Sequence, residues 1–315
     1  MQPSRMKEAL PHLGLLTVYL LWGINITSMK IGGLEWDPVI FNGLRYLSIV
    51  PILWVYTVVY HRKKKLPMRM ERRDLLWMIV LSFASTIGME VVLSYALQYS
   101  STANGAVLGR GFMPIITAVI ALVLKEVRLT WRIGLGIPLA FLSVIVIVGG
   151  KGLNFGAETL RGDLLLLMRS FVGAFYLIYM NRLVVKYRLS LLITLEITFG
   201  ALWLLPWVIG KVDLVYLQGI SQAGWISLAY TSILATLAAF TIHNWGLGQI
   251  GPFKASAYGY TLPVTAAVAG MVILHERLTL SEMVGGIGVL AAMYIVQSDR
   301  MKQAKQMAAR MPQDE

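Results

Sequence analysis

Two stretches of sequence decide the fold, PIITAVIALVLKEVRLT at 114–130 and PVTAAVAGMVILHERLT at 263–279. Each runs from a proline through apolar residues to a glutamate and ends in Arg-Leu-Thr. Pro263 follows Pro114, and Arg277 follows Arg128, by the same 149 positions. Equal offsets at both ends indicate an internal duplication.

The composition is that of a membrane protein. Of the 315 residues, 57% are hydrophobic and only 14% are charged, and the mean hydropathy is +0.67. A soluble chain of this length cannot bury so much apolar surface. Apolar stretches of roughly 20 residues recur, each long enough to cross the hydrocarbon core of a bilayer. We therefore predict an all-α membrane protein, which excludes disordered, fibrous and disulfide-stabilised classes.

The apolar stretches define ten predicted transmembrane spans. Since five spans separate the two copies of the duplicated stretch, and five is odd, the copies have opposite orientations across the bilayer. The prediction is therefore two inverted five-helix repeats, 12–149 and 162–298, around a central cavity, flanked by tails at 1–11 and 299–315. The approximate bounds of the spans are 12–32, 38–59, 75–97, 102–124, 131–149, 162–182, 190–210, 223–246, 252–274 and 280–298.

The 28 lysines and arginines orient these spans. With the N-terminus in the cytoplasm, 20 fall on the cytoplasmic side and 5 on the opposite side, and three lie within spans. This asymmetry predicts both termini in the cytoplasm and a multi-pass protein of the cell membrane. The first apolar run continues to Gly32 without an earlier cleavage site, so it is a retained span. The net charge of +12 thus reflects orientation in the lipid bilayer and not a nucleic-acid partner.

Inverted repeats favour a transporter, because two similar halves can expose one central site to either side alternately. An enzyme is not predicted, since the chain has no cysteine, no His-Glu-x-x-His and no paired aspartates within a span. No metal or cofactor is expected. The nucleotide-binding loop of an ATP-driven pump is also missing, so the energy must come from gradients or a partner. A channel that arose by duplication is the alternative to a transporter, and the sequence does not decide between them.

Several motifs resemble a known family when they are taken together. They are Leu21-Trp22-Gly23-Ile24-Asn25 in the first span, Arg45 in the second, Tyr95-Ala96-Leu97-Gln98-Tyr99-Ser100-Ser101 before the fourth, and the two duplicated stretches. The combination resembles the EamA-type members of the drug/metabolite transporter superfamily over nearly the whole chain. The resemblance implies ten helices in two repeats around a cavity, export as the direction, and substrates among small metabolites, amino acids and drugs.

Five ionisable side chains lie within the predicted spans, where each costs about 2.5–3.5 kcal/mol unless it is paired or hydrated. They are Arg45, Glu90, Arg110, Arg169 and Glu196. Counted from the span ends, the first four occupy one layer, roughly 10–12 Å below the outer surface, with Asn25 at a similar depth. Glu196 falls in the inner half.

Two interpretations of this layer stay open, a structural ion-pair network and the polar floor of a binding cavity. Arg45 matches the arginine that recurs in the family, and we expect it to pair with Glu90. Arg110 and Arg169 lie outside the common pattern and are candidates for binding a carboxylate or phosphate. Asn25 and Glu90 join them as substrate-binding candidates. Five aromatic side chains lie deep within the predicted spans and could stack on a substrate, although packing between helices is the alternative for each. They are Trp22, Tyr95, Tyr176, Tyr258 and Tyr260.

Glu196 and His243 are candidates for proton coupling. A buried carboxyl can carry a proton when its access changes, although a hydrogen bond to a neighbouring helix is the alternative for Glu196. The alternative for His243 is a position in the hydrated membrane interface at the inner end of its span, without a role in proton coupling.

The duplicated stretches supply candidates for gates and hinges. Glu126 and Glu276 end them on opposite faces, and each is predicted to form a helix-end salt bridge with a nearby arginine that shifts between states. Pro114 and Pro263 lie near mid-membrane, where each is predicted to kink its helix beside the central site.

The leading hypothesis is a secondary active transporter that exports a small polar metabolite, such as an amino acid or a related zwitterion or organic anion, by alternating access. The alternative is a drug or quaternary-amine carrier of the same family, which would need more negative charge and an aromatic cage. The substrate, the coupling ion, the oligomeric state and the resting conformation stay open.

Overall fold

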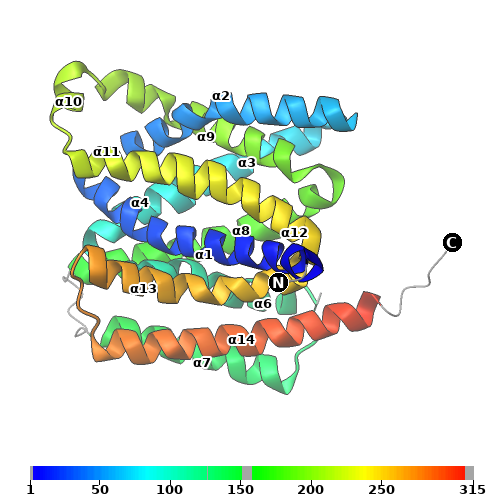
Figure 1. Cartoon of the computed structure of the whole chain (residues 1–315). Coiled ribbons are helices and arrows are strands. Elements are labelled where there is room, and N and C mark those ends of the chain that lie inside the picture. The colour runs from blue at the N-terminus through cyan, green and yellow to red at the C-terminus, as the bar shows by residue number, and fades with distance from the viewer. Residues whose placement is uncertain (1–2, 126, 151–157, 309–315) are drawn as a thin grey trace.

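A computed structural model describes residues 3–125, 127–150 and 158–308, and the secondary structure of this part of the chain is entirely helical, with short connections between the helices. The helices lie side by side in one bundle (Figure 1). Nine helical segments of the described residues are long and apolar enough to cross a membrane. Their bounds are Ala9–Glu35, Pro38–Lys64, Arg72–Tyr99, Thr102–Val123, Trp131–Gly149, Glu158–Lys186, Leu189–Lys211, Gln222–Gly251 and Leu280–Gln303.

Several of these segments combine more than one helical element. The first half of the chain contains α1 (Pro3–Glu35), α2 (Pro38–Lys64), α3 (Arg72–Ser85), η1 (Thr86–Val91), α4 (Val92–Tyr99), α5 (Thr102–Ala106), η2 (Val107–Gly111), α6 (Met113–Val123) and α7 (Trp131–Gly149). The second half contains α8 (Glu158–Lys186), α9 (Leu189–Lys211), α10 (Leu214–Gln218), α11 (Gln222–Ala229), η3 (Tyr230–Ala238), α12 (Ala239–Ser256), η4 (Ala257–Tyr260), α13 (Thr261–Ile273) and α14 (Leu280–Ala308).

The predicted span at 252–274 corresponds to a shorter apolar helix, Ala257–Ile273. The helical geometry before it breaks at Gly251, whose φ of 79° lies in the left-handed region that favours glycine. Pro252 follows directly and cannot donate a helical hydrogen bond. The described part of the chain therefore has nine long spans and this tenth, shorter apolar helix.

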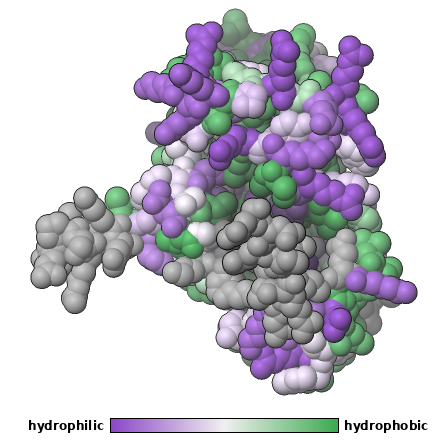
Figure 2. All heavy atoms as spheres, turned by 90° about the vertical axis from the view of Figure 1, so that its right-hand side faces the viewer, coloured by the Kyte–Doolittle hydropathy of each residue, from purple (hydrophilic) through white to green (hydrophobic). Residues whose placement is uncertain are grey.

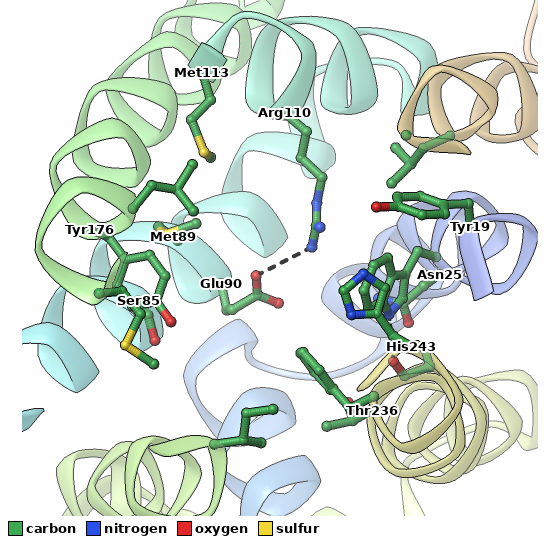
Figure 3. A pocket seen from close by; sticks show the side chains of 18 of the residues that line it. Tyr19, Asn25, Ser85, Met89, Glu90, Arg110, Met113, Tyr176, Thr236 and His243 are labelled. Carbon is green, nitrogen blue, oxygen red and sulfur yellow. Dashed lines mark hydrogen bonds and ion pairs between the residues drawn. The ribbon is translucent and has the colours of Figure 1, made fainter. Parts of the chain in front are cut away.

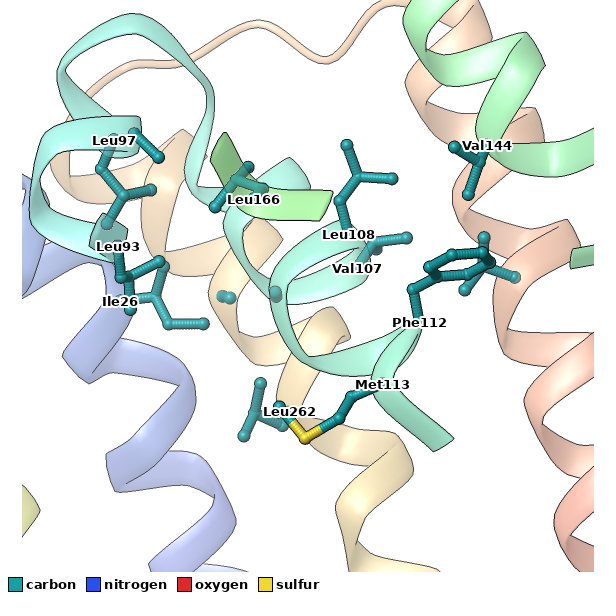
Figure 4. Close-up of a cluster of buried hydrophobic side chains, with 14 of the residues drawn as sticks. Ile26, Leu93, Leu97, Val107, Leu108, Phe112, Met113, Val144, Leu166 and Leu262 are labelled. Carbon is teal, nitrogen blue, oxygen red and sulfur yellow. The ribbon is translucent and has the colours of Figure 1, made fainter. Parts of the chain in front are cut away.

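Three of the long segments are interrupted near their middles by π-helical turns. These turns are η1 in the third segment, η2 in the fourth and η3 in the eighth. A π-helical turn adds a residue to the helical turn and frequently marks a functional site. Buried apolar side chains from α1, α4, α7, α8 and α13 surround η2 (Figure 4).

The bundle has two ends, of which one carries most of the basic side chains. We call the end at which α2 stops and α3 starts the basic end, because Arg62, Lys63, Lys64 and Arg72 lie there. Figure 2 views this end, where hydrophilic side chains project from the bundle. α8 also ends and α9 also begins there, whereas α10 lies at the opposite end (Figure 1).

Helix α1 is central, and it packs closely against α13 (Figure 1). A Cβ atom at Gly23 would lie 2.5 Å from Cβ of Thr265 and 3.1 Å from the carbonyl oxygen of Leu262. The glycine of the Leu-Trp-Gly motif is therefore needed for this contact, since any side chain would push the two helices apart.

We expect Gly23→Val to destabilise the protein by about 1–3 kcal/mol, because the added side chain overpacks the α1–α13 contact. The thermal midpoint of the purified protein in detergent measures the effect. Gly134→Val is the matched control, since a Cβ at Gly134 of α7 meets nothing within 4 Å. Equal midpoints for the two variants would show that Gly23 is not required for close packing.

Candidate functional site

A cavity of about 590 Å³ lies among the helices, a size within the range of small-molecule sites. Its lining comes from both halves of the chain and includes all three π-helical turns, through Glu90 of η1, Arg110 of η2 and Thr236 of η3. It continues to Val184 and Leu189, where α8 gives way to α9. The cavity therefore extends from the middle of the bundle toward the basic end.

Glu90 is the centre of the site, and three arginines surround it. Its Oε2 lies 2.9 Å from Nη1 of Arg45, and its Oε1 lies 3.4 Å from Nη2 of Arg169 and 3.9 Å from Nη2 of Arg110. The structure thus brings together the four charged residues that the sequence places in one layer. Three positive charges and one negative charge leave a formal surplus of +2.

Arg45 uses its donors on the protein. It is buried, and besides Glu90 it donates to Oγ1 of Thr236 from Nε at 3.2 Å and from Nη2 at 3.1 Å. The same threonine oxygen donates to the carbonyl of Thr231 within η3. Arg45 therefore connects α2 to η1 and η3.

Arg169 also uses its donors on the protein, and its side chain has no exposed surface. Its Nε donates to the carbonyl oxygen of Met89 at 3.0 Å, and Nη1 donates to the carbonyl oxygen of Gly109. These carbonyls belong to η1 and η2. Arg169 therefore lies behind Glu90, outside the lining of the cavity, and holds two π-helical turns together.

Arg110 lines the cavity, as Arg45 does, but its guanidinium is the one that projects into it (Figure 3). Its side chain is 36% exposed, and the 3.9 Å to Glu90 is too long for a hydrogen bond. The buried Nε has no hydrogen-bond partner, and the guanidinium donates to no group among the described residues. Arg110 is thus a cation inside the bundle whose donors are free for another molecule.

Glu196 lines the cavity away from this cluster. It accepts hydrogen bonds from the hydroxyls of Ser85 at 2.6 Å and Tyr176 at 2.8 Å. No cation among the described residues forms an ion pair with it. Figure 3 shows Ser85 and Tyr176 on the side of the cavity opposite Tyr19 and Asn25.

A wall of aromatic rings borders the site. The Trp22 ring lies 5.3 Å from Tyr19, 5.6 Å from Phe240 and 5.0 Å from His243, measured between centroids. The Trp22 indole also donates to the carbonyl oxygen of Ala235 at 2.9 Å. All four rings line the cavity, and so does Asn25, which is buried and whose Oδ1 has no partner among the described residues.

Several predicted candidates lie elsewhere. Tyr95 is 36% exposed, and Tyr258 donates or accepts a 2.6 Å hydrogen bond with His12 near the start of α1. Tyr260 donates to Gln297 at 2.8 Å. None of the three tyrosines lines the cavity. Packing and local hydrogen bonds account for these rings.

The predicted gate and hinge residues differ from expectation in their partners. Glu276 pairs with Lys30, at 2.7 Å, and not with its neighbour Arg277. Glu126 lies outside the described residues. Pro114 and Pro263 line the cavity, but each stands in the first turn of a new helix, α6 or α13, after η2 or η4. A first-turn proline removes no hydrogen bond of its own helix. Pro114 nevertheless follows a bend at Phe112 within the segment Thr102–Val123, and Pro263 lies within Ala257–Ile273, so their role as hinges stays a prediction.

The sequence did not identify some lining residues. Tyr19 precedes Trp22 by three residues, and this helical spacing could have placed it on the same face. The other missed residues are uncharged and carry no distinguishing pattern. They include Tyr46, Ser85, Thr236, Asn181, Asn244, Met89, Met113, Met180 and Met293.

Comparisons with known proteins agree with this architecture. The model of the EamA-like transporter family matches residues 10–149 and again 160–298. The uncharacterized transporter YoaV of Bacillus subtilis is 25% identical over 90% of this chain and 95% of its own length. A protein of Salmonella typhimurium named a probable amino-acid metabolite efflux pump is 23% identical over 89% and 92%. A crystal structure with 14% identity superposes with a TM-score of 0.61, covering 92% of this chain and 98% of that one, which shows a shared fold.

We expect Glu90→Gln to lower the free energy of unfolding by about 3–5 kcal/mol, because Arg45 and Arg169 would remain buried without a counter-charge. Thermal unfolding in detergent measures this loss. Lys186→Gln is the matched control, since Lys186, which lies 3.0 Å from Asp74, is 53% exposed, and ion pairs with such exposed groups contribute little. A Glu90→Gln protein as stable as the control would contradict the central role of this carboxylate.

Proposed function

Because this chain belongs to the EamA-like transporter family, we propose that it is a secondary active transporter that exports a small polar metabolite by alternating access. The metabolite is an amino acid or a related zwitterion or organic anion. The protein is a multi-pass membrane protein, as the nine long apolar helices of the described residues indicate, and we place it in the cell membrane.

The observation that carries this proposal is the free guanidinium of Arg110. A cation held inside a bundle of apolar helices is costly unless it is paired or hydrated. Glu90 carries one negative charge for three arginines, and Arg45 and Arg169 lie closer to it than Arg110 does. A planar guanidinium is suited to bind a carboxylate with two parallel hydrogen bonds. A substrate with an anionic group would therefore supply the missing charge.

The proposal includes two inverted five-helix repeats, 12–149 and 162–298, with the tails 1–11 and 299–315 in the cytoplasm. The ends of the duplicated stretches support it. Lys125 and His275 both adopt left-handed backbone conformations, with φ of 59° and 55°. The backbone N–H groups of Val127 and Glu276 each bond to the carbonyl six residues earlier, at 3.4 and 3.1 Å. These two hydrogen bonds join positions related by the offset of 149, so the two copies end their helices with the same bond.

Alternating access requires that one end of the cavity close while the other opens. At the end opposite the basic end, Nζ of Lys30 binds Oε1 of Glu276 and the carbonyl oxygen of Ser100, both at 2.7 Å. Glu276 also accepts from the hydroxyl of Thr102 at 2.6 Å and from its N–H at 3.0 Å. These contacts, which we call the latch, join α1, the α4–α5 turn and the α13–α14 turn. They support a state that is closed at this end and accessible from the basic end.

Proton coupling belongs to the proposal through Glu196. Its two partners are hydroxyl groups, which can accompany either a charged or a protonated carboxyl. His243 is packed among rings and has no acidic partner among the described residues, so Glu196 is the better candidate.

A drug or quaternary-amine carrier is the second candidate function. The four rings of Tyr19, Trp22, Phe240 and His243 favour it, because aromatic faces attract cations. The positive surplus around Glu90 opposes it.

We expect Arg110→Gln to reduce the exchange of labelled amino acids and organic anions in proteoliposomes by more than about tenfold, because the substrate's carboxylate loses its charged partner. Counterflow measures the exchange. Arg161→Gln is the control, since Arg161 lies over the ring of Tyr99, away from the cavity. Exchange of cations alone, unaffected by Arg110→Gln, would instead support the drug-carrier function.

We expect Glu276→Gln to open the latch end, because the neutral side chain loses its ion pair with Lys30. The chain has no cysteine, so spin labels attached through Leu34→Cys and Ile273→Cys would report the distance between α1 and α13 without background. Both positions are exposed. A population with a longer distance should grow in Glu276→Gln. It should not grow in Arg277→Gln, which changes a neighbouring charge without touching the latch, and an unchanged distance in both variants would refute the latch.

A further inference from the structure

We propose that Arg110, Tyr19 and Asn25 together recognise a carboxylate that carries a hydrogen-bond donor on the adjacent carbon, as in an α-amino or α-hydroxy acid. This inference rests on the proposed function and deepens it, since it assigns the chemical class of the substrate and adds Tyr19 to the site.

The three side chains line the same cavity. Figure 3 shows the hydroxyl of Tyr19 directed toward the guanidinium of Arg110, with Asn25 beside Tyr19 on the same side. Tyr19, Trp22 and Asn25 follow one another at intervals of three residues along α1, and all three line the cavity. Helix α1 thus presents two polar side chains, Tyr19 and Asn25, to the same cavity as Arg110.

Arg110 and Tyr19 supply donors for the carboxylate. The Nε of Arg110 is buried and has no partner in the described part of the chain. No described residue accepts a hydrogen bond from Tyr19 either, and its ring is fixed by Trp22 and His243 at 5.3 and 6.0 Å. A carboxylate between the two side chains would accept from both, and the guanidinium would provide the opposite charge.

Asn25 supplies the complementary acceptor. Its side chain is only 5% exposed, yet its Oδ1 has no donor among the described residues. A buried carbonyl oxygen without a donor is costly, and native structures rarely leave one unpaired. An ammonium or hydroxyl group next to the bound carboxylate would satisfy it. A simple carboxylate, which has no such donor, would leave Asn25 unpaired.

This arrangement separates the ligand classes. A quaternary amine has neither an acceptor for Arg110 nor an N–H for Asn25. The remaining volume near the site is bordered by Trp22, Met89 and Met113, so an apolar side chain of moderate size fits beside the polar groups. Methionine is flexible, which permits side chains of different shapes. The class is therefore an α-amino or α-hydroxy acid with an apolar side chain.

The test uses three ligands that share one carbon skeleton and one carboxylate, namely L-leucine, 2-hydroxy-4-methylpentanoate and 4-methylpentanoate. Calorimetry on the full chain purified in detergent measures their dissociation constants. We expect the first two to bind on the order of tenfold more tightly than 4-methylpentanoate, because only they carry a donor for Asn25. The ranking on the unaltered protein tests the inference even if a variant fails to fold.

Variants then assign the effect to residues. Asn25→Ala should bring the three dissociation constants to within about threefold of one another, while Tyr19→Phe should weaken all three to a similar degree. Arg110→Gln should abolish the binding of all three. Asn181→Ala is the matched control, because this asparagine also lines the cavity but is exposed near the end of α8, and it should leave the ranking unchanged.

The outcomes separate the two proposals. Equal binding of all three ligands to the unaltered protein, lost in Arg110→Gln, would overturn the inference about Asn25 and leave carboxylate transport standing. Binding of none of them would contradict both. A leucine preference that survives in Asn25→Ala would place the recognition of the amino group elsewhere and overturn the assignment.

Discussion

The interaction on which the rest of the structure depends is the pairing of two buried arginines with the one carboxylate of Glu90. Arg45 and Arg169 approach its carboxylate from different helices, and each also holds polar groups of a π-helical turn. Through them η1, η2 and η3 are fixed relative to one another. Arg169 donates directly to backbone carbonyls of two of these turns, those of Met89 in η1 and Gly109 in η2, and so stabilises them. The centre of the membrane bundle is thus built from charges.

The same constraint explains why one arginine is available to a ligand. A carboxylate carries a single negative charge, and in this site Arg45 hydrogen-bonds one of its oxygens and Arg169 the other. Arg110 lies at 3.9 Å, within ion-pair distance, but has no hydrogen bond among the described residues. Breaking a buried ion pair costs several kcal/mol, so the protein does not release Glu90 to Arg110. The surplus charge stays in the cavity, where an anionic group can meet it.

Much of the fold followed from the sequence, because its signals are long and redundant. Nine of the ten predicted spans correspond to long apolar helices. The cost of charge in the membrane singled out Arg45, Glu90, Arg110 and Arg169, and their distance from the span ends placed them in one layer. What depth cannot tell is which side of a helix a residue faces. A π-helical turn rotates everything beyond it by about 100° relative to a regular helix, so the period of 3.6 could not separate the free Arg110 from the enclosed Arg169.

Long-range partners were the other unpredictable feature. Glu276 was assigned to a nearby arginine because adjacent opposite charges are the pattern that a sequence displays, yet its partner Lys30 lies 246 positions away. Only the packing of α1 against α13 brings them together. The aromatic residues could not be assigned for the same reason. Tyr95 and Tyr258 lie in apolar spans, as Tyr19 does, and only the rotation of each helix about its axis decides which tyrosine lines the cavity.

Helix α1 joins the two functional parts of the proposed mechanism. It presents Tyr19, Trp22 and Asn25 to the cavity and carries Lys30 of the latch, and Asn25 and Lys30 are only about 7.5 Å apart along the helix axis. A regular helix transmits displacement along its length, because its hydrogen-bond ladder resists local change. A ligand that draws α1 toward Arg110 would therefore also move Lys30 relative to Glu276. In the proposed mechanism the occupancy of the cavity and the closure of its far end would thus be coupled through one rigid element, with no separate relay between them.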